Sequence, residues 1–254
     1  SPAGRLPKNS MNLKFAIGMA LSMALLAAPV RAQQTNKQPR VGFLAASSTN
    51  IPARRAAPAI AHLLPRPVRR ACRDAYRNLC YRIRFSGHGE TDGMLREVMA
   101  WPSGLLHPLP DGVSDADGAM LEPLGVAIHS ADLGHLPFAG AAAVIGCGPI
   151  GLLLIQVLKA AGASSVLAVE PLAHRREAAA RMGADQVADS DAALDDAGVD
   201  VAFEAAGNDG AVGLAMASVR PGGRVVLAGI PGDDSIRFGA SLARRKGLTI
   251  AMVR

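Results

Sequence analysis

A short apolar run followed at once by a glycine-rich turn is the feature that most constrains this chain. Residues 142–145 read AAVI, which is typical of a strand buried in a parallel sheet, and residues 146–151 follow as G-x-G-x-x-G. The first glycine of such a turn allows the tight bend, the second allows a pyrophosphate to approach the backbone, and the third allows close helix–strand packing. The residues predicted to contact the phosphates of a dinucleotide are Gly146, Gly148, Pro149, Ile150 and Gly151.

A helix and a second strand follow this turn. Residues 152–161 are typical of a buried helix that ends near Gly162, and residues 165–169 form a second apolar run. Glu170 closes that run nineteen residues after Gly151. An acid near this spacing accepts hydrogen bonds from the adenosine ribose hydroxyls. We therefore predict dinucleotide binding, with Glu170 at the ribose, in preference to a glycine turn that serves packing alone.

The charges around Glu170 bear on the choice between NAD and NADP. A carboxylate repels the 2′-phosphate of NADP, so Glu170 favours NAD. His174, Arg175 and Arg176 lie just beyond it, and cations at this place can accommodate NADP. Arg175 is the candidate cofactor contact among them. The alternative is that all three form a solvated first helical turn. Both interpretations stay open, with NAD as the expected cofactor and NADP as the second.

The alternation of strands and helices continues to residue 254. Strands are expected at 185–187, 199–204, 224–229 and 248–253, helices at 172–182 and 211–219, and a turn at 221–223. Ala205, Gly207 and Gly229 are small residues that leave room for a cofactor where strands end. Because crossovers are right-handed, this alternation predicts an α/β, doubly wound parallel sheet of the Rossmann type, in the order 3-2-1-4-5-6. We assign residues 140–254 to this NAD(P)-binding domain.

The positive charge of the chain does not indicate a nucleic-acid partner. The formal net charge is +6, but nine arginines are crowded between residues 54 and 84. Few aromatic residues lie between them that could stack on nucleic-acid bases. The apolar content of 50% is ample for a folded core.

The first forty residues resemble a secretory leader. Lys14 gives a charged start, residues 15–30 an apolar core, and Val30-Arg31-Ala32 a small-residue cleavage site. The apolar stretch is short for a membrane span of about twenty residues, so we expect no span. If the leader directs export, the protein is periplasmic or secreted; otherwise we expect it in the cytoplasm.

A short stretch after the leader resembles a different class of protein. Residues 40–48, RVGFLAASS, resemble the opening strand of a periplasmic ABC-transporter substrate-binding protein. This resemblance supports an alternative function, an exported solute-binding protein. We expect residues 41–65 to form a poorly ordered junction, because their Ala, Pro and Arg content matches no regular element.

Residues 66–254 resemble the zinc-dependent medium-chain alcohol and polyol dehydrogenases. Cys72 and Cys80, with the ending Asn-Leu-Cys, resemble the third and fourth ligands of that family's structural zinc lobe. The first two ligand positions would fall at Arg66 and Arg69, which repel a cation, so the cysteines are expected to be a remnant, as free thiols or a disulfide. The resemblance implies that residues 66–139 are part of a β-rich, GroES-like catalytic domain.

By this resemblance, Glu122 points towards a polyol or amino-alcohol branch of that family. It lies where sorbitol and threonine dehydrogenase-like members carry a glutamate near the catalytic zinc. Without the family, an acid beside a helical proline is expected to be exposed. His88 and Glu90 are one residue apart in a glycine-rich loop, and we interpret them as turn residues and not as metal ligands.

The resemblance implies hydride transfer between an alcohol or polyol and nicotinamide, with zinc as the family's metal and a homo-oligomer as a compatible state. A catalytic zinc needs three protein ligands, yet residues 1–65 contain no cysteine and His62 is their only histidine. We therefore expect a truncated member that binds NAD(P) and turns over little or nothing. A zinc-free NAD(P)-dependent reductase is a further alternative.

Overall fold

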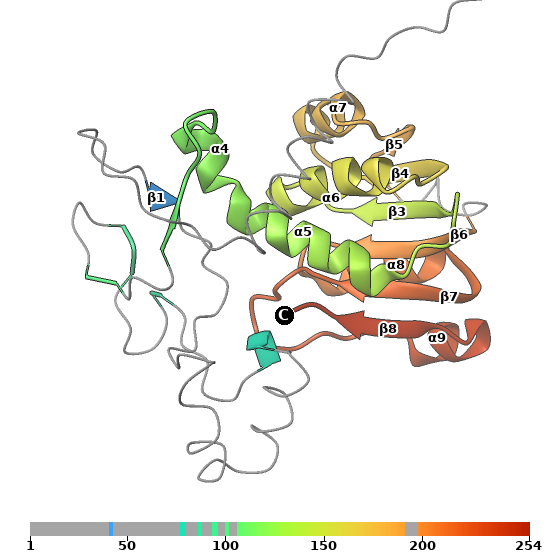
Figure 1. The fold of residues 1–254 in the computed structure, drawn as a ribbon. Coiled ribbons are helices and arrows are strands. Elements are labelled where there is room, and N and C mark those ends of the chain that lie inside the picture. Colours follow the sequence, from blue (N-terminus) through green and yellow to red (C-terminus); the bar gives the residue numbers. More distant parts are fainter. Residues whose placement is uncertain are drawn as a thin grey trace, which may run out of the picture. The chain divides into compact units, whose positions relative to one another are not determined.

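A computed structural model describes residues 41–42, 77–79, 86–87, 93–95, 100–101, 106–190 and 198–254 (Figure 1). The expected leader, most of the expected junction, Cys72, Cys80, His88 and Glu90 lie outside the described residues. Their interpretations therefore stay predictions.

A six-stranded sheet organises the described residues. In Figure 1 its strands follow one another from top to bottom in the order β5-β4-β3-β6-β7-β8, and every neighbouring pair is parallel. This order equals 3-2-1-4-5-6 when the strands are counted along the chain, so the predicted Rossmann topology is confirmed. The strands are β3 (Ala141–Ile145), β4 (Ser165–Val169), β5 (Gln186–Ala188), β6 (Val199–Glu204), β7 (Val219–Leu227) and β8 (Thr249–Met252).

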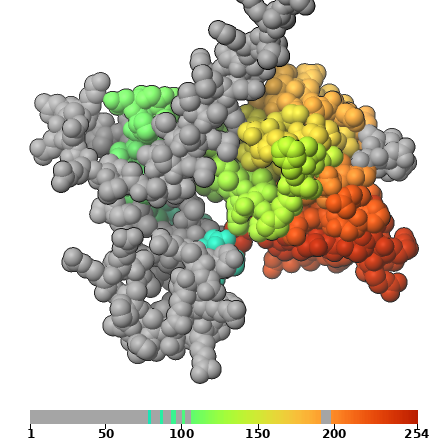
Figure 2. All heavy atoms as spheres, turned by 45° about the vertical axis from the view of Figure 1, so that its right-hand side comes forward, coloured from blue at the N-terminus to red at the C-terminus, as the bar shows by residue number. Residues whose placement is uncertain are grey.

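Helices cover both faces of this sheet because strand residues alternate in direction. Ala142 and Val144 of β3 belong to the core shared with α5 (Leu121–Gly134), α6 (Pro149–Ala160) and α7 (Ala173–Arg181). Ala143 and Ile145 belong to the core on the opposite face, shared with α8 (Asp209–Ser218) and packed against α9 (Ala240–Lys246). Figure 2 shows the atoms of α5 and α6 as a continuous green-to-yellow surface.

Smaller elements precede the sheet. The 3-10 helix η1 spans Arg77–Leu79, and the two-residue strands β1 (Val41–Gly42) and β2 (His107–Pro108) pair antiparallel. Helix α4 (Asp115–Ala119) begins at Ser114, whose hydroxyl accepts a hydrogen bond from the Asp117 N–H. Ser114 is therefore the N-cap of α4. Within the part of the chain that the structure describes, no helix is long and apolar enough to cross a bilayer.

Three local features differ from the sequence-based expectation. Helix α6 begins at Pro149, inside the glycine-rich turn, because proline suits the first turn of a helix. The expected turn at 221–223 lies within β7, where the pairing with β6 shifts register and Gly222 adopts a φ of 75°. Helix α9 was not expected, because its arginines and lysine mask a weak apolar pattern.

Two aspartates fasten the amino ends of the central strands. Asp200 accepts a hydrogen bond from the N–H of Ala141 at 2.9 Å and from Arg220 at 2.8 Å. Asp185 accepts from the N–H of Val166 at 2.7 Å and from Lys159. Both carboxylates therefore lie at the amino ends of the strands, whereas the glycine-rich turn lies at the carboxyl ends.

Candidate functional site

The turn after β3 has the geometry that its three glycines predict. Gly146 adopts a φ of 96°, a left-handed conformation that favours glycine, and its N–H donates to the Val169 carbonyl at 2.8 Å. A Cβ on Gly151 would overlap the carbonyl oxygen of Gly146. The first turn of α6 therefore packs directly on the bend, as predicted.

The backbone at the N-terminus of α6 is accessible to a ligand. Gly148 is the N-cap residue, and no side chain among the described residues caps this end. A Cβ placed on Gly148 would meet no atom within 4 Å. Pro149 and Ile150 open the helix beside it. Unpaired N–H groups and the positive end of the helix dipole favour an anion at such a place.

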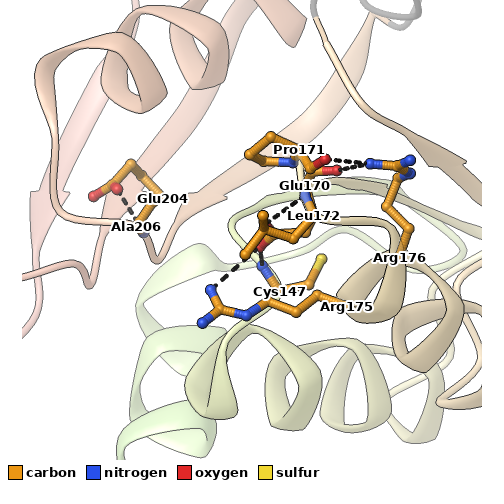
Figure 3. A network of polar contacts seen from close by, with 8 residues as sticks. All are labelled: Cys147, Glu170, Pro171, Leu172, Arg175, Arg176, Glu204 and Ala206. Atoms are coloured by element: carbon orange, nitrogen blue, oxygen red, sulfur yellow. Dashed lines mark hydrogen bonds and ion pairs between the residues drawn. The ribbon is translucent and has the colours of Figure 1, made fainter.

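Glu170 lies beside this turn and is held by backbone N–H groups (Figure 3). One carboxylate oxygen, Oε2, accepts from the Cys147 N–H at 2.9 Å, and Oε1 accepts from the Leu172 N–H at 3.1 Å. The residue is only 3% exposed. Glu170 therefore joins the end of β4 to the glycine-rich turn, an arrangement that its spacing from Gly151 did not reveal.

The two arginines of α7 are held differently (Figure 3). Arg176 donates to the carbonyl oxygens of Glu170 at 2.8 Å and Pro171 at 2.6 Å. Arg175 is exposed, and its guanidinium lies 3.9 Å from Oε2 of Glu170. His174 is exposed. Arg176 therefore holds the backbone after β4, whereas Arg175 faces the Glu170 carboxylate from the surface.

Cys147, the middle residue between Gly146 and Gly148, is fully buried. The pKa of its thiol is raised to about 12, mainly by burial and also by the negative charge of Glu170, while Arg175 opposes the rise. The thiol is therefore protonated at neutral pH, and Cys147 acts as a packing residue and not as a nucleophile.

The predicted residues of the other half of the site follow β6 and β7. Ala205 donates its N–H to the Ile145 carbonyl at 2.8 Å, which joins the ends of β6 and β3. Gly207 adopts a φ of 71°, and Gly229 lies against it. The structure thus brings the predicted cofactor residues together at the carboxyl edge, on both sides of β3. Sequence reasoning missed Glu204, whose only signal is an acid that ends an apolar strand.

The described residues form no metal centre at this place. Glu122 is exposed in the first turn of α5, in agreement with its expected exposure. Among the described residues, no group of three or more His, Cys, Asp or Glu side chains could hold a metal ion. The metal assignments of Glu122, Cys72 and Cys80 stay predictions.

Comparison with known proteins identifies the family. A sequence profile described as zinc-binding dehydrogenase matches residues 149–254. Sorbitol dehydrogenase of Bacillus subtilis is 34% identical over 177 residues, which are 65% of this chain and 50% of that protein. Residues 149–254 belong to the zinc-binding dehydrogenase family. D-xylulose reductase of Saccharomyces cerevisiae is 32% identical over 68% of the chain and 52% of the relative.

Solved structures of dehydrogenases share the fold. The 2R,3R-butanediol dehydrogenase of Bacillus subtilis has a TM-score of 0.62 and 33% identity, over 69% of this chain and 53% of the other. An alcohol dehydrogenase of Escherichia coli CFT073, solved with NADH, has a TM-score of 0.65 and 26% identity, over 72% of this chain and 56% of the other. The chain spans about half the length of the relatives that it matches.

Proposed function

We propose that residues 140–254 bind a nicotinamide dinucleotide across the carboxyl ends of β4, β3 and β6. The observation that carries this proposal is the uncapped start of α6 behind the open face of Gly148, with the Glu170 carboxylate beside it. In open α/β sheets, ligands bind at the switch point where crossovers leave in opposite directions. Here that point lies between β3 and β6.

The start of α6 and Glu170 contact different parts of the dinucleotide in this proposal. The N–H groups at the start of α6 receive the pyrophosphate, and Glu170 accepts hydrogen bonds from the adenosine ribose hydroxyls. A carboxylate offers about four lone-pair sites, and two backbone N–H groups use only two of them. Because Glu170 is buried, a ribose reaches it only after a neighbour moves. Arg175 is exposed and ends a long flexible side chain, so we assign that movement to it.

The same residues favour NAD over NADP. A 2′-phosphate would face the Glu170 carboxylate, and Arg176 already donates to two backbone carbonyls. Arg175 is the cation left to contact a phosphate, and it lies beside a carboxylate that offsets its charge. We therefore expect NADH to bind roughly tenfold more tightly than NADPH, about 1.4 kcal/mol.

The names of the relatives support a proposal for the class of reaction. Sorbitol dehydrogenase and D-xylulose reductase are named for polyol and ketose substrates, so we propose that this chain derives from an oxidoreductase of that class. A bound nicotinamide supplies the hydride acceptor or donor in such a reaction. In this proposal the described residues bind the nicotinamide cofactor of that reaction. Sorbitol oxidation that increases when zinc is added would contradict the sequence-based expectation of little turnover.

A titration of the full chain tests the binding. We expect saturable binding of NADH by fluorescence, and we expect Glu170→Ala to weaken it roughly tenfold, because hydrogen bonds to a charged group are worth about 1.5–3 kcal/mol. Glu177→Ala is the matched control, since Glu177 is an exposed acid on α7 whose partner is Arg181 at 4.0 Å. An absence of saturable binding by the folded wild-type chain at millimolar NADH would refute the proposal.

A further inference from the structure

Glu204 is the most deeply buried acid in the described part of the chain, with an exposed fraction of 0%. It is the last residue of β6, directly at the switch point. Its Oε1 accepts hydrogen bonds from the N–H groups of Ala206 at 2.7 Å and Gly207 at 2.5 Å. Figure 3 shows Glu204 and Ala206 on a different strand end from the Glu170 cluster.

The backbone of Glu204 also holds the end of β7. Its carbonyl oxygen accepts from the N–H of Ala228 at 2.8 Å and of Gly229 at 3.0 Å. A single residue thus holds two loops, one after β6 through the side chain and one after β7 through the main chain. Both loops carry residues that the sequence assigned to the cofactor.

The second carboxylate oxygen of Glu204 is the unusual atom of this cluster. Oε2 is buried and has no hydrogen-bond partner among the described residues. A Cβ built on Gly229 would lie 2.7 Å from Oε2 and would overlap the backbone N of Gly207. Burying a polar atom without a partner costs free energy, and the two hydrogen bonds that Oε1 accepts leave the burial of Oε2 unexplained. The acid is therefore poorly explained as core packing.

Glu204 and Glu170 occupy equivalent places on the two sides of β3. Glu204 is the last residue of β6 and Glu170 directly follows β4, and both strands pair with β3. Each carboxylate is buried and accepts hydrogen bonds from the N–H groups of a loop at the carboxyl ends of the strands. Glu170 holds the glycine-rich turn, where the adenosine half of a dinucleotide binds in this fold. Glu204 holds the loops of the opposite half, where the second nucleotide binds in this fold.

We propose that Glu204 is a positioning residue for the nicotinamide half of the site. It fixes the backbone of residues 205–207 and 228–229 in the shape that receives the second nucleotide, and it makes no contact with the adenosine half. This inference rests on the proposed dinucleotide binding, which it deepens by assigning the two halves of the ligand to two separate carboxylates.

Two substitutions of Glu204 separate positioning from packing. Glu204→Gln keeps an acceptor oxygen for Ala206 and Gly207, so NADH affinity should stay within about threefold of wild type. Glu204→Met keeps most of the volume and removes the acceptor, so NADH should bind about tenfold more weakly or worse. ADP-ribose, which lacks the nicotinamide, should bind both variants within about twofold of wild type.

The results that would overturn the inference differ from those that would overturn the proposed function. If wild type binds neither NADH nor ADP-ribose, both fail. If wild type binds both ligands and Glu204→Met weakens them equally, or weakens neither, only the role of Glu204 fails. An equal loss of NADH affinity in Glu204→Gln and Glu204→Met would also overturn it, because the retained acceptor would then have no effect.

A second pair of variants covers the case in which Glu204→Met does not fold. Gly229→Ala places a Cβ against Gly207 and Oε2 and should weaken NADH while sparing ADP-ribose. Gly232→Ala, in the same loop, is the control, because its Cβ would meet no atom within 4 Å. If Gly229→Ala weakens both ligands equally, weakens neither or also fails to fold, Glu204 has a structural role alone.

Discussion

At the scale of single residues, the acids of the sheet divide by the edge on which they lie. Glu170 and Glu204 lie at the carboxyl edge and hold loops there, whereas Asp185 and Asp200 fasten strand starts at the opposite edge. The sequence predicted Glu170 because its spacing from the glycine-rich turn is a known signal. Glu204 has no such signal, since the closeness of its carboxylate to Gly229 depends on how β6 and β7 pack.

Gly151 gives a residue-scale prediction. Gly151→Ala would drive a Cβ into the Gly146 carbonyl oxygen, so α6 would have to move away from the turn. We expect a loss of about 2 kcal/mol or more in the free energy of unfolding, and weaker NADH binding. Denaturant unfolding and the NADH titration measure the two effects.

Gly125→Ala is the matched control for this prediction. Gly125 is exposed in α5, and its Cβ would meet no atom within 4 Å. Alanine should therefore stabilise this helix by about 0.5–1 kcal/mol and leave NADH binding unchanged. Equal stability of the two alanine variants would show that helix α6 does not press on the turn.

At the scale of elements, polar side chains fix the ends of strands and helices. Most element positions were predictable because apolar periodicity and glycine mark them, and the second strand and the fourth coincide with their predicted residues, 165–169 and 199–204. The bulge in β7 was not predictable, because Pro221 and Gly222 are equally typical of a turn outside a strand. Helix α9 was missed because its arginines and lysine mask a weak apolar pattern, and the contact of Lys246 with the end of α8 depends on tertiary packing.

Asp200 carries an element-scale prediction of pH dependence. Hydrogen bonds from Arg220 and from the Ala141 N–H lower the pKa of Asp200 below its usual value, against the effect of burial, and the charge of Arg220 lowers it further. A lowered pKa in the folded state means that the stabilisation is present above the unfolded pKa, near 4, and is lost as the pH falls through the folded value.

Asp200→Asn should therefore destabilise the chain at neutral pH by at most about 1 kcal/mol, because the pair with Arg220 is partly exposed. The difference from wild type should shrink as the pH falls below about 4. Denaturant unfolding at several pH values measures it, with Asp233→Asn in the exposed loop after β7 as control. A difference that stays constant with pH would contradict the role of the Asp200 charge.

Lys246 of α9 carries a second prediction at this scale. Its ammonium donates to the carbonyl oxygens of Met216, Ala217 and Val219 at the end of α8. Burial lowers its pKa. Lys246→Met leaves those carbonyls without this donor and should cost about 1–2 kcal/mol of unfolding free energy. Arg244→Met, at an exposed position of the same helix, should cost less than about 0.5 kcal/mol, and equal losses would show that capping is not the cause.

At the scale of the whole molecule, the order of the sheet decides what the chain can bind. The strand order was predictable because right-handed crossovers leave few alternatives for alternating strands and helices. That order places the glycine-rich turn, Glu170 and the loops after β6 and β7 at one edge, although they are far apart in sequence. The expectations for the leader and the cysteines concern residues outside the described ones and remain predictions.

The central claim is that one edge of the sheet binds one dinucleotide across both of its halves. Amide hydrogen exchange of the full chain, with and without saturating NADH, tests it most directly. We predict slower exchange in residues 146–151, 170–172, 205–207 and 229–230, and unchanged exchange at the opposite edge, around residues 141 and 185. Protection at that opposite edge, or no protection of either half despite bound NADH, would contradict the account.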